Sequence, residues 1–189
     1  MTSTTAADLL AQGDLRRGIA EVMNDLGPSV YGLLRTLFRK QEDLAEEAFS
    51  LFAENLCRYA GTYRREAPLK AWVYALARNA AVTVTRDGWH KRGRRLATRE
   101  AERLADGVRT RSALRFERQS RVLDDLRDTL DLDEQTLLAL RIDEKLPWEE
   151  VALVMTSDGI PVDSQAVRKR FERLKVRLGE EARRLGHLG

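Results

Sequence analysis

A basic segment near the end of the chain holds the residues best suited to chemistry. Gln and Arg side chains can make paired hydrogen bonds to purine edges, and Lys and Arg also anchor phosphates. Gln165, Lys169 and Arg173 are spaced by four residues, which places them on one face of a helix, with Arg168 at its flank. The opposite face is predicted to be an inward stripe of Val167, Phe171, Leu174, Leu178 and Leu185. This pattern predicts a helix whose exposed face binds DNA.

The residues before this helix favour a helix-turn-helix. A shorter helix is expected over Pro147–Met155, because proline is tolerated in a first helical turn. The turn Thr156–Asp163, rich in Ser, Asp, Gly and Pro, follows it. In the motif, the second helix lies in the major groove with its first residues at base edges. This turn is longer than the usual three or four residues, so a small wing and a loose loop both stay open. The alternative is a solvated helix that packs in a bundle.

Aromatic and cationic side chains are mixed in a second segment, Tyr59–Arg95. Aromatics beside cations can stack on unpaired bases and follow a nucleic-acid backbone. The candidate ligands of this segment are Tyr63, Arg64, Asn79, Thr83, Arg86, Lys91 and Arg92. A solvated helix end explains the cluster Lys91–Arg95 equally well, and Trp72 at helical spacing is more typical of a core residue. For Tyr63, a core position and a ligand position are about equally favoured.

A third pattern is the acidic amphipathic helix predicted over Gln41–Tyr59. Its inward stripe is Leu44, Ala48, Leu51, Phe52 and Leu56. Its other faces carry Glu42, Asp43, Glu46, Glu47 and Glu54. A charged side of this kind can dock a partner helix, although an exposed acidic face is the commoner outcome.

Composition argues against several classes of protein. The single cysteine, Cys57, excludes an internal disulfide, and the two histidines do not make a zinc site. No apolar run approaches the roughly 20 residues of a membrane helix, and the first residues do not resemble a signal peptide. We therefore expect a cytoplasmic protein with no membrane span, metal or cofactor. Without a nucleophile–base pair or a phosphate-binding glycine loop, we expect no catalytic residues and no enzyme.

Apolar residues recur at spacings of three and four, which predicts an all-α fold with two helical domains. The first domain, residues 1–87, is expected to hold helices over about 14–26, 28–38, 41–59 and 68–86. Residues 88–118 contain few large apolar side chains and are expected to be a basic linker with transient or partner-dependent helix. The second domain, residues 119–189, is expected to hold helices over about 120–130, 133–142, 147–155 and 164–185.

Charge is distributed unevenly, although the net charge is only +3. Residues 86–118 contain 11 basic and five acidic side chains, and residues 164–189 contain eight and three. The segment between them, 119–163, contains four basic and twelve acidic side chains. A polyanion would be attracted to both basic blocks, although solvated helix faces explain any one block equally well.

In this order, the segments resemble the extracytoplasmic-function class of bacterial RNA polymerase sigma factors, which keep only the second and fourth conserved sigma regions. The most specific pieces are Ala71-Trp72 with Ala77-Arg78-Asn79, within APLKAWVYALARNAAVTVTR, and the helix Trp148-Glu149-Glu150-Val151-Ala152. The likeness covers roughly residues 5–86 and 120–180. Pro68-Leu69, Ala45 and the long turn Thr156–Asp163 depart from the family's pattern.

The resemblance implies roles for particular residues. The polymerase-binding segment would contain Glu42, Asp43, Leu44, Glu46, Glu47, Phe49 and Phe52. The promoter-melting segment would contain Tyr63, Arg64, Arg65 and Lys70. The helix that reads the −10 element would contain Asn79, Thr83 and Arg86, and the helix that reads the −35 element Gln165, Arg168, Lys169 and Arg173. The implied partners are core RNA polymerase and promoter DNA, duplex at −35 and melted at −10. An anti-sigma factor is a further candidate partner, and the linker would thread into polymerase.

We therefore expect a sigma factor that directs promoter recognition, DNA melting and transcription initiation. One alternative is a stand-alone helix-turn-helix regulator whose N-terminal bundle senses a signal or dimerises, and which binds duplex DNA only. Another is a helical adaptor for acidic proteins or RNA, for which weak binding that is indifferent to duplex structure is expected.

Overall fold

The computed structural model describes residues 5–87, 98–112, 126–156 and 160–185. These residues form helices, turns and connecting loops, which confirms the predicted all-α class. The chain divides into two compact units, Met1–Leu114 and Arg115–Gly189. Within the described residues, no helix is long and apolar enough to cross a membrane.

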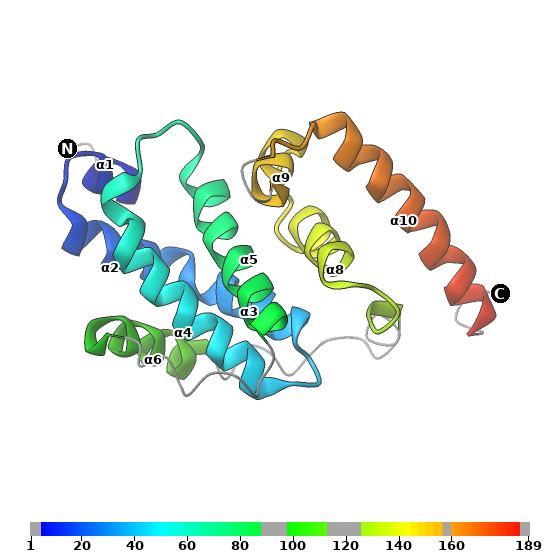
Figure 1. Cartoon of the computed structure of the whole chain (residues 1–189), viewed down its shortest axis with the longest axis horizontal. Helices are drawn as coiled ribbons and strands as arrows, with labels where there is room; N and C mark the ends of the chain where they lie inside the picture. The colour runs from blue at the N-terminus through cyan, green and yellow to red at the C-terminus, as the bar shows by residue number, and fades with distance from the viewer. Residues whose placement is uncertain (1–4, 88–97, 113–125, 157–159, 186–189) are drawn as a thin grey trace. The chain divides into compact units, whose positions relative to one another are not determined.

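The N-terminal unit is built around one long central helix. Its elements are α1 (Ala6–Ala11), α2 (Leu15–Asp25), α3 (Gly27–Leu37), α4 (Glu42–Tyr59), the 3₁₀ turn η1 (Ala60–Thr62), α5 (Leu69–Asp87) and α6 (Arg99–Ser112). The central helix, α4, packs against α3, α5 and α6, and Figure 1 shows α5 and α6 beside it. Phe49 and Phe52 of α4 lie in the core, together with Leu34 of α3 and Tyr74 of α5.

Local signals in the sequence explain several helix starts. Asp14 caps α2 by accepting a hydrogen bond from the backbone amide of Arg17 at 3.4 Å, and Pro28 lies in the first turn of α3. The sequence did not predict α1. That helix begins with a capping box, in which Thr5 and Asp8 each accept a hydrogen bond from the other's backbone amide.

The largest difference from prediction is α6, which lies inside the segment that the sequence predicted to be a linker. The helix packs against α2, α3 and α4, so the first compact unit continues beyond residue 87 (Figure 1). Its buried stripe is Ala101, Ala105 and Val108, which are too small to give a strong apolar pattern. Gly27 makes room for this stripe, because a Cβ atom there would lie 2.8 Å from Val108 Cγ2.

The C-terminal unit contains three helices and one π-helical turn among its described residues. They are α8 (Leu132–Leu138), the π-helical turn η2 (Ala139–Asp143), α9 (Trp148–Met155) and α10 (Ser164–Arg184). A capping box of Asp131 and Glu134 begins α8. The ring of Trp148 meets that of Phe171 at a centroid distance of 5.3 Å, which joins α9 to α10. The helix predicted over 120–130 falls mostly outside the described residues.

The predicted inward stripe of α10 is correct only for its first part. Val167, Phe171 and Leu174 are buried, whereas Leu178 is half-buried and Leu185 is 40% exposed. Leu185 lies after the last residue of α10. Ala182, near the end of the helix, is buried, so α10 packs through its first half and again near its end. The candidate DNA-binding residues lie in the first half.

Candidate nucleic-acid interface

The outward face of α10 presents a group of polar and cationic side chains. Gln165, Lys169 and Arg173 are exposed, as the helical spacing predicted, and Arg168 is exposed at the flank. Within the described parts of the chain, Arg168, Lys169 and Arg173 form no ion pair. Their charges are therefore available to an anionic ligand.

The remaining cations near them on α10 are paired with acidic residues. Arg170 lies 3.9 Å from Asp131 and 3.8 Å from Asp133, and Arg177 lies 2.6 Å from Glu134. These pairs tie α10 to the start of α8. Glu172, an exposed acidic side chain next to Arg173 in the sequence, pairs with Lys175 at 2.7 Å. The cations of α10 thus fall into two groups. Arg170 and Arg177 hold α10 against the start of α8, whereas the unpaired cations are available to a ligand.

Glu134 stabilises the start of α8 and also holds α10 against it. One of its oxygens accepts a hydrogen bond from the Asp131 amide at 3.1 Å and another from the Arg177 guanidinium at 2.6 Å. The Arg177 hydrogen bond, followed by that of the Asp131 amide, lowers the pKa of Glu134 against the opposing effect of burial. The carboxylate therefore stays charged and keeps α10 on α8 at neutral pH.

The turn between α9 and α10 is partly ordered by Thr156. Its hydroxyl donates to the Ala152 carbonyl at 3.0 Å and accepts from the Val162 amide at 3.4 Å. Residues 157–159 fall outside the described residues, so the choice between a wing and a loop is not tested. Asp163 is the N-cap residue of α10 but makes no side-chain cap hydrogen bond. The backbone amides in the first turn of α10 therefore receive no hydrogen bond from the Asp163 carboxylate.

Tyr63, a candidate ligand, lies inside the N-terminal unit. Its side chain is buried, its ring lies 5.2 Å from that of Trp72, and its hydroxyl donates to the Ala67 carbonyl at 3.1 Å. Burial raises the pKa of Tyr63. A ring packed in this way offers no free face to a base, which favours the core interpretation of Tyr63 over the ligand interpretation. The residue instead supports the loop before α5.

The cations around Tyr63 differ in their exposure and in their interaction partners. Arg64 is exposed and donates to the Gly61 carbonyl at 2.7 Å. Arg65 has a left-handed backbone, with φ 60°, and is ion-paired with Asp8 of α1. Hydrogen bonds from Thr5, and then from Arg65, lower the pKa of Asp8 to about 2. Lys70 is half-buried, with its ammonium 5.7 Å from the Tyr74 ring centroid. Arg64 is therefore an exposed cation that, within the described residues, pairs with no carboxylate.

The predicted edge of α5 is present on the surface. Asn79 and Arg86 are exposed and Thr83 is half-buried between them. A single helix thus presents one amide, one hydroxyl and one cation in a row. The predicted ligands Lys91 and Arg92 lie outside the described residues.

The acidic helix α4 keeps only part of its predicted binding face. Glu42, Asp43 and Glu47 are exposed, and Leu44 and Glu46 are half-buried. Phe49 and Phe52 are fully buried, so direct contact of these two side chains with a partner is not possible in this conformation. The reason is their position on the same side as Ala45, Ala48 and Leu56, which face the core of the unit. The accessible part of the face is a set of carboxylates.

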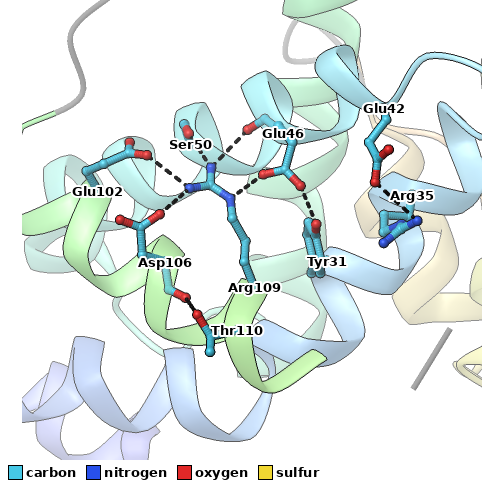
Figure 2. A network of polar contacts seen from close by, with 9 residues as sticks. All are labelled: Tyr31, Arg35, Glu42, Glu46, Ser50, Glu102, Asp106, Arg109 and Thr110. Carbon is cyan, nitrogen blue, oxygen red and sulfur yellow. Dashed lines mark hydrogen bonds and ion pairs between the residues drawn. The ribbon is translucent and has the colours of Figure 1, made fainter. Parts of the chain in front are cut away.

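Arg109 of α6, which sequence reasoning missed, occupies one edge of this acidic face. Figure 2 shows its guanidinium among Glu46, Ser50, Glu102 and Asp106. It is ion-paired with Glu46, lies 2.9 Å from Glu102 and 2.8 Å from Asp106, and donates to Ser50 Oγ at 2.5 Å. Burial opposes its charge, but these acidic partners outweigh burial and raise the pKa of Arg109. The spacing of Glu102, Asp106 and Arg109 was the available sequence signal.

No group of three or more potential metal ligands occurs among the residues that the structure describes. No protein-family model matches the chain. No curated protein matches it either.

Proposed function

We propose that the chain is a sigma factor of the extracytoplasmic-function class, which binds core RNA polymerase and directs promoter recognition, melting and initiation. The observation that carries the proposal is the division of charge on α10. Arg168, Lys169 and Arg173 are unpaired within the described residues, whereas Arg170 and Arg177 are held by α8. Unpaired cations grouped on one helix suit binding to the phosphates and base edges of DNA.

In this proposal, α10 lies in the major groove of the −35 element. Gln165, near the start of the helix, would contact base edges, and Arg168, Lys169 and Arg173 would contact bases or phosphates. The ion pairs between α8 and α10 would fix the orientation of α10 relative to α8. Because phosphate contacts release counterions, binding would weaken as salt rises.

The N-terminal unit would supply the two other contacts. The exposed edge of α5, with Asn79, Thr83 and Arg86, would bind unpaired bases of the −10 element, and Arg64 would bind the nearby backbone. Glu42, Asp43 and Glu47 would meet a basic surface of core polymerase, which carries the nucleotide chemistry itself. The proposal places the protein in the cytoplasm, where transcription occurs.

The test is a titration with core polymerase followed by run-off transcription from promoters selected with the reconstituted holoenzyme. We expect binding and promoter-dependent initiation by the unmodified chain. A variant with Lys169→Ala and Arg173→Ala should still bind polymerase but lose most initiation at promoters that depend on the −35 element. Arg183→Ala, which removes an exposed cation at the far end of α10, is the matched control. Absence of polymerase binding would defeat the proposal.

The burial of Tyr63 favours one alternative, a stand-alone helix-turn-helix regulator that binds duplex DNA only. It removes an aromatic ring from the surface that would hold unpaired bases. Permanganate reactivity of promoter thymines separates the two functions. Reactive thymines that appear only with polymerase and this chain together support the sigma factor, whereas a footprint without polymerase and without reactive thymines supports the regulator.

A further inference from the structure

Helix α6 runs antiparallel along one edge of α4. Near the start of α4, Arg109 meets Glu46 and Ser50 (Figure 2). Near the end of α4, burial raises the pKa of the Cys57 thiol, and the nearby charge of Glu100, at the opposite end of α6, raises it further. The contact therefore extends over most of both helices, and it covers the side of α4 on which Glu46, Ser50 and Cys57 follow one another at helical spacing.

Both carboxylate oxygens of Glu46 are occupied in this arrangement. Oε1 accepts a hydrogen bond from the Tyr31 hydroxyl, and Oε2 is ion-paired with Arg109 Nε. A second guanidinium nitrogen of Arg109 donates to the Glu46 backbone carbonyl at 3.2 Å. The guanidinium also lies 5.8 Å from the Phe49 ring centroid. A cation from another protein would have to compete with Arg109 for Glu46, whose side chain is only 34% exposed.

Helix α6 packs mainly through small side chains. Its fully buried residues are Ala101, Ala105, Val108 and Ser112, and Leu104 is half-buried beside them. The helix therefore buries less apolar area than one whose buried positions are all Leu or Phe. Gly107 lies in the middle of the helix with nothing within 4 Å of the place of its Cβ, and its φ is not positive. No packing or backbone reason therefore requires glycine at a position where it weakens a helix.

We infer that α6 is a reversible cover over the Glu46 edge of α4, and that core polymerase must displace it to bind there. This inference rests on the proposed function and adds a regulatory step to it. Arg109 is the cation that polymerase replaces. The fraction of molecules with α6 displaced then sets the apparent affinity, because only those molecules present the whole acidic face.

The test compares the affinity of three full-length variants and the unmodified chain for core polymerase. Arg109→Ala frees Glu46 and should bind tighter, by a factor on the order of ten. Gly107→Ala strengthens α6 and should bind about five-fold weaker. Arg103→Ala removes an exposed cation of the same helix that has no ion pair within the described residues, and should bind like the unmodified chain. Circular dichroism of each variant checks that the fold is kept.

Amide hydrogen exchange over residues 99–112 gives a second readout that does not depend on any variant. These amides should be protected in the free protein and lose protection in the complex with polymerase. Equal affinities for all four proteins, or protection that persists in the complex, would overturn the inference and leave the proposed function standing. If none of the four proteins binds polymerase, the proposed function fails, and the inference fails with it.

Discussion

Glu134 links the start of α8 to the side of α10, and its effect depends on its charge. Its pKa is lowered in the folded protein, so the stabilisation is complete above its unfolded pKa of about 4.3 and is lost as pH falls through the folded value. The Arg177 side chain is about half exposed, which limits the contribution of the pair through solvent screening.

We expect Glu134→Gln to lower the free energy of unfolding by about 0.5–1 kcal/mol at pH 7, because glutamine can still cap α8 but cannot pair with Arg177. The difference from the unmodified chain should shrink as the pH falls below about 4. Urea unfolding at pH 7 and pH 3.5 measures it. A difference that is the same at both pH values would show that the charge of Glu134 contributes nothing.

At Arg173, the expected effect is on DNA binding. If this side chain contacts a phosphate, Arg173→Ala should reduce the slope of log affinity against log salt by about 0.9 for a duplex that contains the recognised site. Fluorescence anisotropy of the duplex with holoenzyme, over a range of salt concentrations, measures this slope. Arg183→Ala should leave it unchanged. An equal slope for Arg173→Ala and its control would remove Arg173 from the interface.

At the level of elements, the close contact of α3 with α6 can be tested through Gly27. A methyl group at this position would lie 2.8 Å from Val108 Cγ2, so α6 or α3 must shift. We expect Gly27→Ala to destabilise the N-terminal unit by roughly 1–3 kcal/mol. Combining it with Val108→Ala should recover part of that loss, because the clashing methyl groups are removed.

A double-mutant cycle with thermal unfolding gives the coupling between the two positions. Gly107→Ala serves as a control for replacing glycine by alanine in a helix, since its Cβ would meet nothing. It should stabilise the helix by up to about 1 kcal/mol. If Gly27→Ala behaves like this control, the packing of α6 on α3 is looser than described.

The elements show what the sequence could predict and what it could not. Capping by Asp14 and by the pair of Asp131 and Glu134 could be predicted, because these signals are local. The outward position of Gln165, Lys169 and Arg173 followed from helical spacing alone. In contrast, α6 could not be predicted as a packed helix, because its buried face depends on space that Gly27 provides in a distant helix. The burial of Tyr63 and Phe49 likewise depends on the tertiary structure.

The family resemblance assigned roles to residues by their position in the sequence. It could not distinguish exposed residues from buried ones within the same segment. It assigned Phe49 and Phe52 to a binding face together with Glu42 and Asp43, although only the carboxylates are accessible. Residue type already held part of the answer, because a phenylalanine in the inward stripe of an amphipathic helix is usually core. Glu46 was assigned to the same face, and only the structure revealed its partner, Arg109.

For the whole molecule, the two compact units predict separate responses to substitution. Arg109 makes its contacts within Met1–Leu114, and Arg177 within Arg115–Gly189. We expect Arg109→Ala to reduce amide protection in the first unit only, and Arg177→Ala in the second only. The stability effects of the two substitutions should add within about 0.5 kcal/mol in the double variant. Loss of protection in both units from either substitution would mean that they unfold as one.

The aromatic contacts described above give each unit an optical signal of its own. Trp72 lies against the Tyr63 ring, while Trp148 lies against Phe171 with the Arg141 guanidinium 4.7 Å from its ring centroid. Once Trp89 is replaced by phenylalanine, the emission of the chain comes from these two indoles. Removing either one leaves a fluorophore that reports the packing of a single unit, so the N-terminal and C-terminal halves can be followed separately during a titration with core polymerase or DNA.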